Sequence, residues 1–363
     1  MLAVARKLQR PVRLSQRQRR AGSSASVPST ARVSRAKAPP IVSLDDDSGD
    51  ALAQAFEEFG CCYLTSHGIS SALESATLAS ARAFFALPEA AKAAIPVVQN
   101  GQGFTRGYIG VGKESGSAER IEVKEAFSYG YEWDAATTGF ANGLQGPNVW
   151  PPPTAHWSAG ERATLTDFFT HMVAASRRVS QHLGRSLYAD VGFLDRFCHA
   201  GDTISIMRAF HYFPYAAFGA PAPAGHEFIG SSPHTDWGFL TLILQDAVGG
   251  LQVLHRGDWL DVPHVPGTVV ANAGDYLSLV TGGQCASPVH RVVADDRERY
   301  SMVFFYYPDF DAVIPAVAPQ ARRIGGLAGA GAQAFNNLLD GTVTDVDGCF
   351  GDYIMAKWAG VQR

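Results

Sequence analysis

Three residues in the second half of the chain are spaced so that they could bind one metal ion. His234 and Asp236 are separated by a single residue, and His290 begins a short apolar run further along. Residues i and i+2 of an extended segment point to the same side, so we expect His234 and Asp236 to face one cavity. Two imidazoles and one carboxylate form the facial ligand set of a non-haem iron(II) site, which leaves coordination positions open for other molecules. Because a His-x-acid pair also arises by chance, the prediction depends on the surrounding elements.

A second polar pair follows the third candidate ligand. Arg299 and Ser301 are also two residues apart, at the start of a predicted strand. A guanidinium can bind a carboxylate through two parallel hydrogen bonds while a hydroxyl donates one more. Because Arg299 follows soon after His290, a hairpin would bring both into the same barrel. The pair therefore predicts a carboxylate site beside the metal.

The elements that must position these residues differ between the two halves of the chain. The first half reads mainly as helices, with a Gly- and Pro-rich irregular segment over residues 96–155. Two capping boxes are predicted, at Ser71 with Glu74 and at Ser158 with Glu161. The predicted elements are strands at 41–44 and 61–65, helices at 49–59 and from Ser71 to Pro88, and a long helix from Ser158 to about residue 190.

The second half reads as short strands with a two-residue period and Gly-rich turns between them. The predicted strands are 204–213, 239–245, 251–255, 268–272, 276–280, 289–294 and 301–307. This spacing indicates a double-stranded β-helix, or jelly roll. We therefore predict an α+β fold in which a helical N-terminal half packs against a jelly-roll barrel. The predicted parts are a basic segment at 1–38, a helical region at 39–198, the jelly-roll core at 199–317, and a C-terminal loop and closing helix at 318–363.

Taken together, the motifs resemble those of the iron(II)/2-oxoglutarate-dependent dioxygenase superfamily, in its isopenicillin N synthase-like branch. The resemblance is carried by His234-x-Asp236, His290 and Arg299-x-Ser301, and it covers about residues 40–358. Supporting segments are Ser66-His67-Gly68-Ile69, Phe84-Phe85-Ala86-Leu87-Pro88, Gly107-Tyr108-Ile109, Trp150-Pro151, Gly249-Gly250-Leu251-Gln252-Val253 and Asn272-Ala273-Gly274-Asp275.

The resemblance implies that His234, Asp236 and His290 are the catalytic iron ligands. It also implies that Arg299 and Ser301 bind the far carboxylate of 2-oxoglutarate, a cosubstrate used together with O2. The expected reaction couples oxidative decarboxylation of 2-oxoglutarate to hydroxylation, desaturation or cyclisation of a small organic molecule. Ascorbate is compatible with such an enzyme as a reductant.

One segment departs from the family pattern. The family often has Asn-x-Tyr-Pro, whose tyrosine hydroxyl helps to bind the cosubstrate, and the segment here is His211-Tyr212-Phe213-Pro214. Phe213 fills the predicted tyrosine position, and Tyr212 would replace it only if a β-bulge turned it inward.

Two alternative functions therefore stay open. One is an iron oxidase that needs no 2-oxoglutarate, in which Arg299 binds the substrate's own carboxylate. The other is a catalytically silent jelly-roll binding protein, which the complete ligand set disfavours.

Charge is distributed unevenly along the 363 residues. Residues 1–38 contain ten basic residues and no acid, whereas the rest carries 20 basic and 34 acidic residues. The basic segment predicts either a chloroplast or mitochondrial transit peptide or a basic tail of a cytoplasmic protein. An acidic body disfavours nucleic-acid binding. No apolar run is long enough to predict a membrane span.

The five cysteines predict free thiols, with Cys61 and Cys62 in a buried strand. A monomer is the default expectation.

Overall fold

The computed structural model describes residues 38–95, 97–99, 105–113, 120–218, 222–314 and 348–361. The predicted basic segment, apart from its last residue Ala38, and the predicted Gly- and Ala-rich loop at 318–334 lie outside the described residues. Contacts group Ala38–Arg363 into one compact unit. Within the described ranges, no helix combines the length and apolarity needed to cross a membrane.

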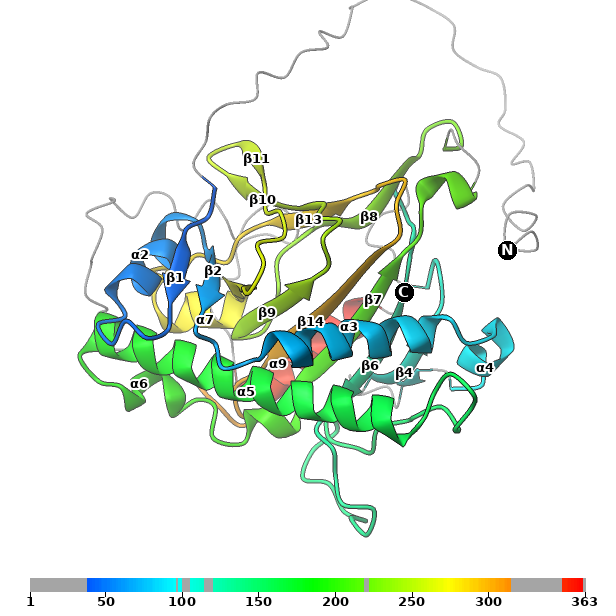
Figure 1. Ribbon diagram of the computed structural model, residues 1–363. Coiled ribbons are helices and arrows are strands. Elements are labelled where there is room, and N and C mark those ends of the chain that lie inside the picture. The colour runs from blue at the N-terminus through cyan, green and yellow to red at the C-terminus, as the bar shows by residue number, and fades with distance from the viewer. Residues whose placement is uncertain are drawn as a thin grey trace, which may run out of the picture. The chain divides into compact units, whose positions relative to one another are not determined.

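Two β-sheets form the framework (Figure 1). The larger sheet has nine strands in the order β1 (Ile41–Ser43), β2 (Cys61–Thr65), β12 (Val269–Ala273), β9 (Leu240–Gln245), β14 (Arg299–Tyr306), β7 (Ile206–Tyr212), β6 (Lys124–Gly130), β4 (Thr105–Ile109) and β3 (Val98–Gln99). The smaller sheet has five strands in the order β11 (Asp258–Asp261), β10 (Leu251–His255), β13 (His290–Val293), β8 (Glu227–His234) and β5 (Arg120–Glu122). Pairing is antiparallel except for β1 with β2 and β5 with β8.

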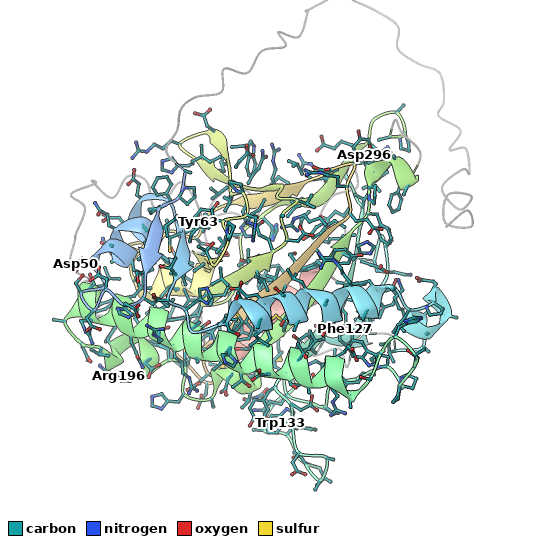
Figure 2. The ribbon with its side chains drawn as sticks, in the orientation of Figure 1. Asp50, Tyr63, Phe127, Trp133, Arg196 and Asp296 are labelled. Carbon is teal, nitrogen blue, oxygen red and sulfur yellow. The ribbon has the colours of Figure 1, made fainter. Side chains whose placement is uncertain are left out.

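The two longest helices cover the outer face of the larger sheet, the face turned away from the smaller sheet. The α-helices are α2 (Asp50–Glu58), α3 (Ser71–Phe85), α4 (Glu89–Ala93), α5 (Ala159–Tyr188), α6 (Gly192–Asp195), α7 (Asp275–Val280) and α9 (Phe350–Val361). Figure 1 shows α3 and α5 side by side along this face, and both contact β14. Phe304 of β14 meets Phe169 of α5 edge to face, with ring centroids 5.1 Å apart. Figure 2 places Phe127 beside α3, where it stacks on Phe84.

Most predicted elements are present, with corrections that follow from tertiary contacts. The predicted irregular segment 96–155 is only partly so: its first part contributes β3 to β6 to the two sheets, whereas residues 131–155 contain no helix or strand. The predicted strand at 276–280 is the short helix α7, whose buried side chains mimic a strand in hydropathy. β8 lies outside the predicted strands.

The two predicted capping boxes have different outcomes. The box at Ser158 and Glu161 is confirmed. The cap of α3 is Ser70 and not Ser71, because the Ser70 side chain accepts the hydrogen bond from the Leu73 amide. Cys61 and Cys62 are buried in β2 with free thiols, as predicted.

Candidate metal centre and cosubstrate site

The three predicted metal ligands lie together on the smaller sheet and the loop that follows β8. His234 is the last residue of β8, and His290 is the first residue of β13 and pairs directly with His234 in the antiparallel ladder. Asp236 follows two residues after His234. One potential ligand atom from each side chain lies within 4.8 Å of the other two.

Backbone hydrogen bonds orient both imidazoles in the same way. The Nδ1 atoms of His234 and His290 lie 2.7 and 3.1 Å from the carbonyl oxygens of Ser232 and Pro288. A carbonyl only accepts, so each Nδ1 carries the proton and donates it. The two Nε2 atoms lie 3.8 and 3.7 Å from the Asp236 carboxylate oxygens. The unprotonated Nε2 atoms and one carboxylate are therefore the donor set that suits a ferrous ion.

The protonation states also suit metal binding. The pKa of His234 is lowered to about 4 by partial removal of its imidazole from water and by the neighbouring His290, so the imidazole is neutral near pH 7. Burial alone would raise the pKa of Asp236. The two imidazoles and a hydrogen bond from Asn272 outweigh burial and hold this pKa below its ordinary value, so the carboxylate is charged. Metal binding requires these two forms, a neutral imidazole and a carboxylate.

The end of β12 fixes the loop that carries Asp236. The Asn272 side-chain amide donates to Asp236 Oδ2 at 2.8 Å, and the Asp275 amide donates to the Asp236 carbonyl at 2.7 Å. At Gly274 the two backbones nearly touch, because a Cβ there would lie 2.1 Å from the Gly238 carbonyl oxygen. Only glycine allows this approach without displacement of the loop.

We expect Asn272→Ala to weaken iron(II) binding by roughly ten- to 100-fold, the usual effect of removing a group that orients a metal ligand. The ligands themselves stay, so binding should not be abolished. The measurement is an iron(II) competition titration against a coloured chelator. Asn142→Ala, which removes a half-buried turn hydrogen bond to the Leu144 amide, is the control and should bind iron like the wild type. Unchanged affinity in Asn272→Ala would show that Asp236 needs no such support.

Arg299 and Ser301 lie on the inner face of the larger sheet, as a rigid pair. Arg299 is 2% exposed. Its Nε donates to the Gly249 carbonyl at 2.6 Å, its Nη1 to the Ser301 hydroxyl at 3.2 Å, and its Nη2 to Gln245 Oε1 at 3.3 Å. A guanidinium has five N–H donors, so two remain for a further acceptor. Ser301 accepts from Arg299, and its own proton is available to the same acceptor.

The predicted hairpin between His290 and Arg299 is wrong. β13 pairs with β10 and β8, whereas β14 pairs with β7 and β9. The connection crosses from the smaller sheet to the larger one. The two residues therefore belong to facing layers.

Tyr212, rather than Phe213, faces Arg299. Tyr212 pairs with Arg299 across β7 and β14 in an unbroken register, and its ring centroid lies 4.6 Å from the guanidinium carbon. No bulge is needed, because strand alternation starting from Arg208 already turns Tyr212 inward. The Phe213 ring packs on Phe218 instead. The sequence interpretation assigned the inward position one residue too late.

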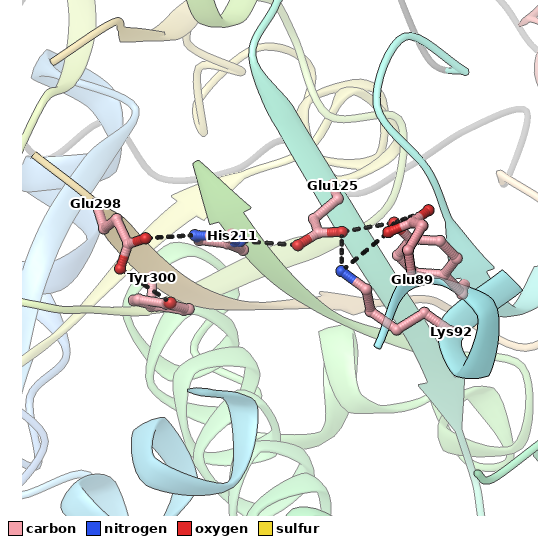
Figure 3. A network of polar contacts seen from close by, with 7 residues as sticks. Glu89, Lys92, Glu125, His211, Glu298 and Tyr300 are labelled. Carbon is pink, nitrogen blue, oxygen red and sulfur yellow. Dashed lines mark hydrogen bonds and ion pairs between the residues drawn. The ribbon is translucent and has the colours of Figure 1, made fainter. Parts of the chain in front are cut away.

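His211, which begins the segment His211-Tyr212-Phe213-Pro214, lies on the outer face and belongs to a network of polar contacts under α3 and α4 (Figure 3). Its Nδ1 lies 2.8 Å from a carboxylate oxygen of Glu125, and its ring stacks on Tyr300. Glu125 also accepts hydrogen bonds from Lys92 Nζ at 2.6 Å and from the Tyr108 hydroxyl at 2.5 Å. The network therefore ties the helices to β6 and β7 without entering the metal site.

We expect Glu125→Gln to lower the free energy of unfolding by about 3 kcal/mol, because it leaves the Lys92 ammonium without its buried partner. Burial alone would raise the pKa of Glu125, but hydrogen bonds from His211, Lys92 and Tyr108 hold it below its ordinary value. Its stabilisation is therefore complete above the pKa of an unfolded glutamate and is lost as the pH falls through the lower folded pKa.

Urea denaturation at neutral and acidic pH tests this. The control Glu227→Gln removes an exposed ion pair with Arg120 and should change stability by less than about 1 kcal/mol. Equal effects of the two substitutions would contradict the role of Glu125.

Three inward residues were missed as site residues by the sequence interpretation, in part because their placement depends on strand pairing. They are Lys124, Gln245 and Asn272. Lys124 reaches from β6 to the smaller sheet, where its Nζ lies 2.8 Å from Glu122 and 3.1 Å from the Ser231 hydroxyl. Only Asn272 had a local signal, the segment Asn272-Ala273-Gly274-Asp275.

Comparisons with known proteins agree with this geometry. Residues 204–308 match the family model of the 2OG-Fe(II) oxygenase superfamily, and residues 39–153 match that of the non-haem dioxygenase in morphine synthesis N-terminal region. The chain is 32% identical to the 2-oxoglutarate-dependent dioxygenase citB of Monascus ruber, over 74% of this chain and 83% of that protein.

Solved structures show the same fold. The crystal structure of a full-length Neurospora crassa protein in complex with alpha-KG and thymine has a TM-score of 0.69 and 24% identity, and the match covers 88% of this chain and 96% of that one. A putative 2OG-Fe(II) oxygenase family protein from Caulobacter crescentus has a TM-score of 0.64 and 27% identity, with 80% and 96% covered. The fold is therefore of the jelly-roll type that these oxygenases share.

Proposed function

The chain belongs to the 2OG-Fe(II) oxygenase superfamily as a 2-oxoglutarate-dependent dioxygenase, and we propose that it oxidises a small organic molecule at a ferrous centre held by His234, Asp236 and His290. The convergence of these three ligand atoms within 4.8 Å carries the proposal. When bound, iron(II) supplies the open coordination positions at which 2-oxoglutarate and dioxygen react.

The protein residues hold the reactants in place around that centre. Hydrogen bonds to backbone carbonyls keep both imidazoles in the tautomer that presents Nε2. Asn272 holds one Asp236 oxygen, so the carboxylate cannot rotate freely. On the facing sheet, Arg299 is immobilised by Gly249, Gln245 and the Tyr212 ring, and its remaining N–H donors and the Ser301 hydroxyl receive the far carboxylate of 2-oxoglutarate. Rigid placement of these donors before binding reduces the entropy lost on binding.

The relatives' dependence on 2-oxoglutarate favours this function over an iron oxidase that needs no cosubstrate. The experiment is a screen of small organic molecules for substrate-stimulated succinate release, in the presence of iron(II), 2-oxoglutarate and oxygen. Mass spectrometry of each positive compound should show either the gain of one oxygen atom or the loss of two hydrogens. Oxidation of a substrate with no 2-oxoglutarate present would favour the iron oxidase.

A further inference from the structure

The strand β8 is irregular just before it presents its metal ligand. His234 pairs with His290 at the start of β13. Three residues earlier on β8, Ser231 pairs with Val292, which is only two residues further along β13. β8 therefore contains one extra residue between these pairs, which makes a β-bulge. Bulges are frequent beside active sites, where they change the direction of a side chain. The direction of the His234 side chain thus depends on what holds the bulge.

A buried carboxylate on the neighbouring strand holds the bulge. Glu122 is the last residue of β5 and is 5% exposed. Its Oε1 accepts a hydrogen bond from the Ser232 amide at 2.8 Å. The other residue between the two paired positions is Pro233, which has no N–H to donate. Glu122 therefore binds the one amide that these two residues offer.

Lys124 fixes this carboxylate from the larger sheet. Its Nζ lies 2.8 Å from Glu122 Oε2 and 3.1 Å from the Ser231 hydroxyl at the start of the bulge. Burial alone would raise the pKa of Glu122, but the Lys124 ammonium and the hydrogen bonds from Ser232 hold it below its ordinary value. The carboxylate is therefore charged near pH 7, and a charged acceptor binds an amide more strongly than a neutral one.

The contacts continue from the bulge to the metal ligand. The Ser232 carbonyl accepts from His234 Nδ1 at 2.7 Å, which leaves Nε2 for the metal. Because the amide and the carbonyl belong to one residue, a carboxylate that holds the amide limits how far the carbonyl can turn. His290 is positioned differently, since β13 pairs with β10 in a continuous register. Glu122 is therefore connected to one of the two imidazoles and not to the other.

We propose that Glu122, held by Lys124, is a positioning residue that sets the orientation of the His234 imidazole through the Ser232 backbone. This inference rests on the proposed function, because it concerns the metal centre of the same site. Glu122 acts through Ser232 and is not itself a ligand. Its loss should therefore loosen one metal ligand while the other two keep their places.

The first test is an anaerobic iron(II) competition titration of the full chain. Glu122→Ala should weaken binding by roughly five- to 50-fold, somewhat less than the loss of a group that touches a ligand directly. Glu122→Gln keeps an acceptor oxygen for the Ser232 amide and should lose clearly less. The matched control is Glu227→Ala, which removes an exposed carboxylate that pairs with Arg120 across the same two strands. It should bind iron like the wild type.

The second test reports on each imidazole separately, by proton NMR of the cobalt(II)-loaded proteins. The wild type should show two strongly shifted resonances that disappear in D2O, the Nδ1 protons of His234 and His290. In Glu122→Ala one of them should move or exchange with solvent faster, while the other stays unchanged. Glu122→Gln should keep both near their wild-type positions. A general loss of stability would instead affect both resonances together.

Thermal melting of the metal-free proteins identifies a variant that has lost its fold. Should Glu122→Ala not fold, Glu122→Asp replaces it. This variant keeps the charge beside Lys124 but is one methylene shorter, so it should still change one resonance selectively.

Unchanged affinity and resonances in Glu122→Ala, equal changes of both resonances, or an equal loss of affinity in Glu122→Gln would each overturn the inference. A wild type that binds neither iron(II) nor cobalt(II) would contradict the proposed function. A wild type that binds metal, together with any of the three results above, contradicts only the role of Glu122.

Discussion

His290→Ala should abolish stoichiometric iron(II) binding and, with it, turnover. The substitution removes one of three protein ligands, and the hydrogen bonds that orient His234 and Asp236 cannot supply another donor atom. Because His290 is the first residue of β13 and is paired on both sides, the strand itself should persist. The measurement is iron content after anaerobic loading and desalting, together with succinate formation.

The matched control is His171→Ala, which removes an exposed imidazole on α5 whose Nδ1 lies 3.0 Å from the Asp167 carbonyl one turn earlier. It should bind one iron per chain, as the wild type does. Thermal melting of the metal-free proteins shows whether either variant has lost its fold. A folded His290→Ala protein with full iron content and full turnover would show that the metal is held elsewhere.

Arg299→Leu should raise the apparent KM for 2-oxoglutarate by roughly ten- to several-hundred-fold, because it removes the charge-assisted hydrogen bonds to the far carboxylate. Iron binding should be retained, since no ligand is changed. Ser301→Ala removes one neutral donor, worth about 1 kcal/mol, and should raise the KM less. Succinate formation is measured against 2-oxoglutarate concentration for both variants.

Arg297→Leu is the control for this pair, because Arg297 lies two residues earlier in the chain and its ion pair with Asp295 is at the surface. Its KM for 2-oxoglutarate should be unchanged. If Arg299→Leu also left this KM unchanged, the carboxylate recognised by Arg299 would be that of another molecule.

Local patterns predicted the elements that carry strong periodicity or end signals. The long helix with its Ser158 cap and the buried strand at Cys61–Thr65 were predicted well, because each is specified by its own residues. The helix Asp275–Val280 was predicted as a strand because it is buried on nearly all sides, so its hydropathy shows no helical period. Strands β5 and β6 were missed because they pair with β8 and β7, far away in the sequence. Strands β3 and β4 pair locally but lie in a Gly-rich segment that indicates loops.

The site could be predicted where two residues share one strand or loop. His234 with Asp236, and Arg299 with Ser301, follow from two-residue alternation alone. The inward position of Tyr212 does not, because it depends on the register of β7 against β14. His211 shows the same dependence, since the phase of β7 places it on the outer face with Glu125. Spacing gives the period of a strand, whereas pairing decides which phase faces the site.

The most direct test of the central claim is a single-turnover measurement with 2-oxoglutarate labelled at C1. The protein is loaded anaerobically with one equivalent of iron(II) and with labelled 2-oxoglutarate and is then mixed with oxygenated buffer, with the wild type and Asp236→Ala run in parallel. We predict labelled carbon dioxide and unlabelled succinate in equal amounts from the wild type, and neither above the protein-free background from Asp236→Ala. Equal yields from the two proteins, or no label released by an iron-loaded wild type, would contradict a dioxygenase centre built on His234, Asp236 and His290.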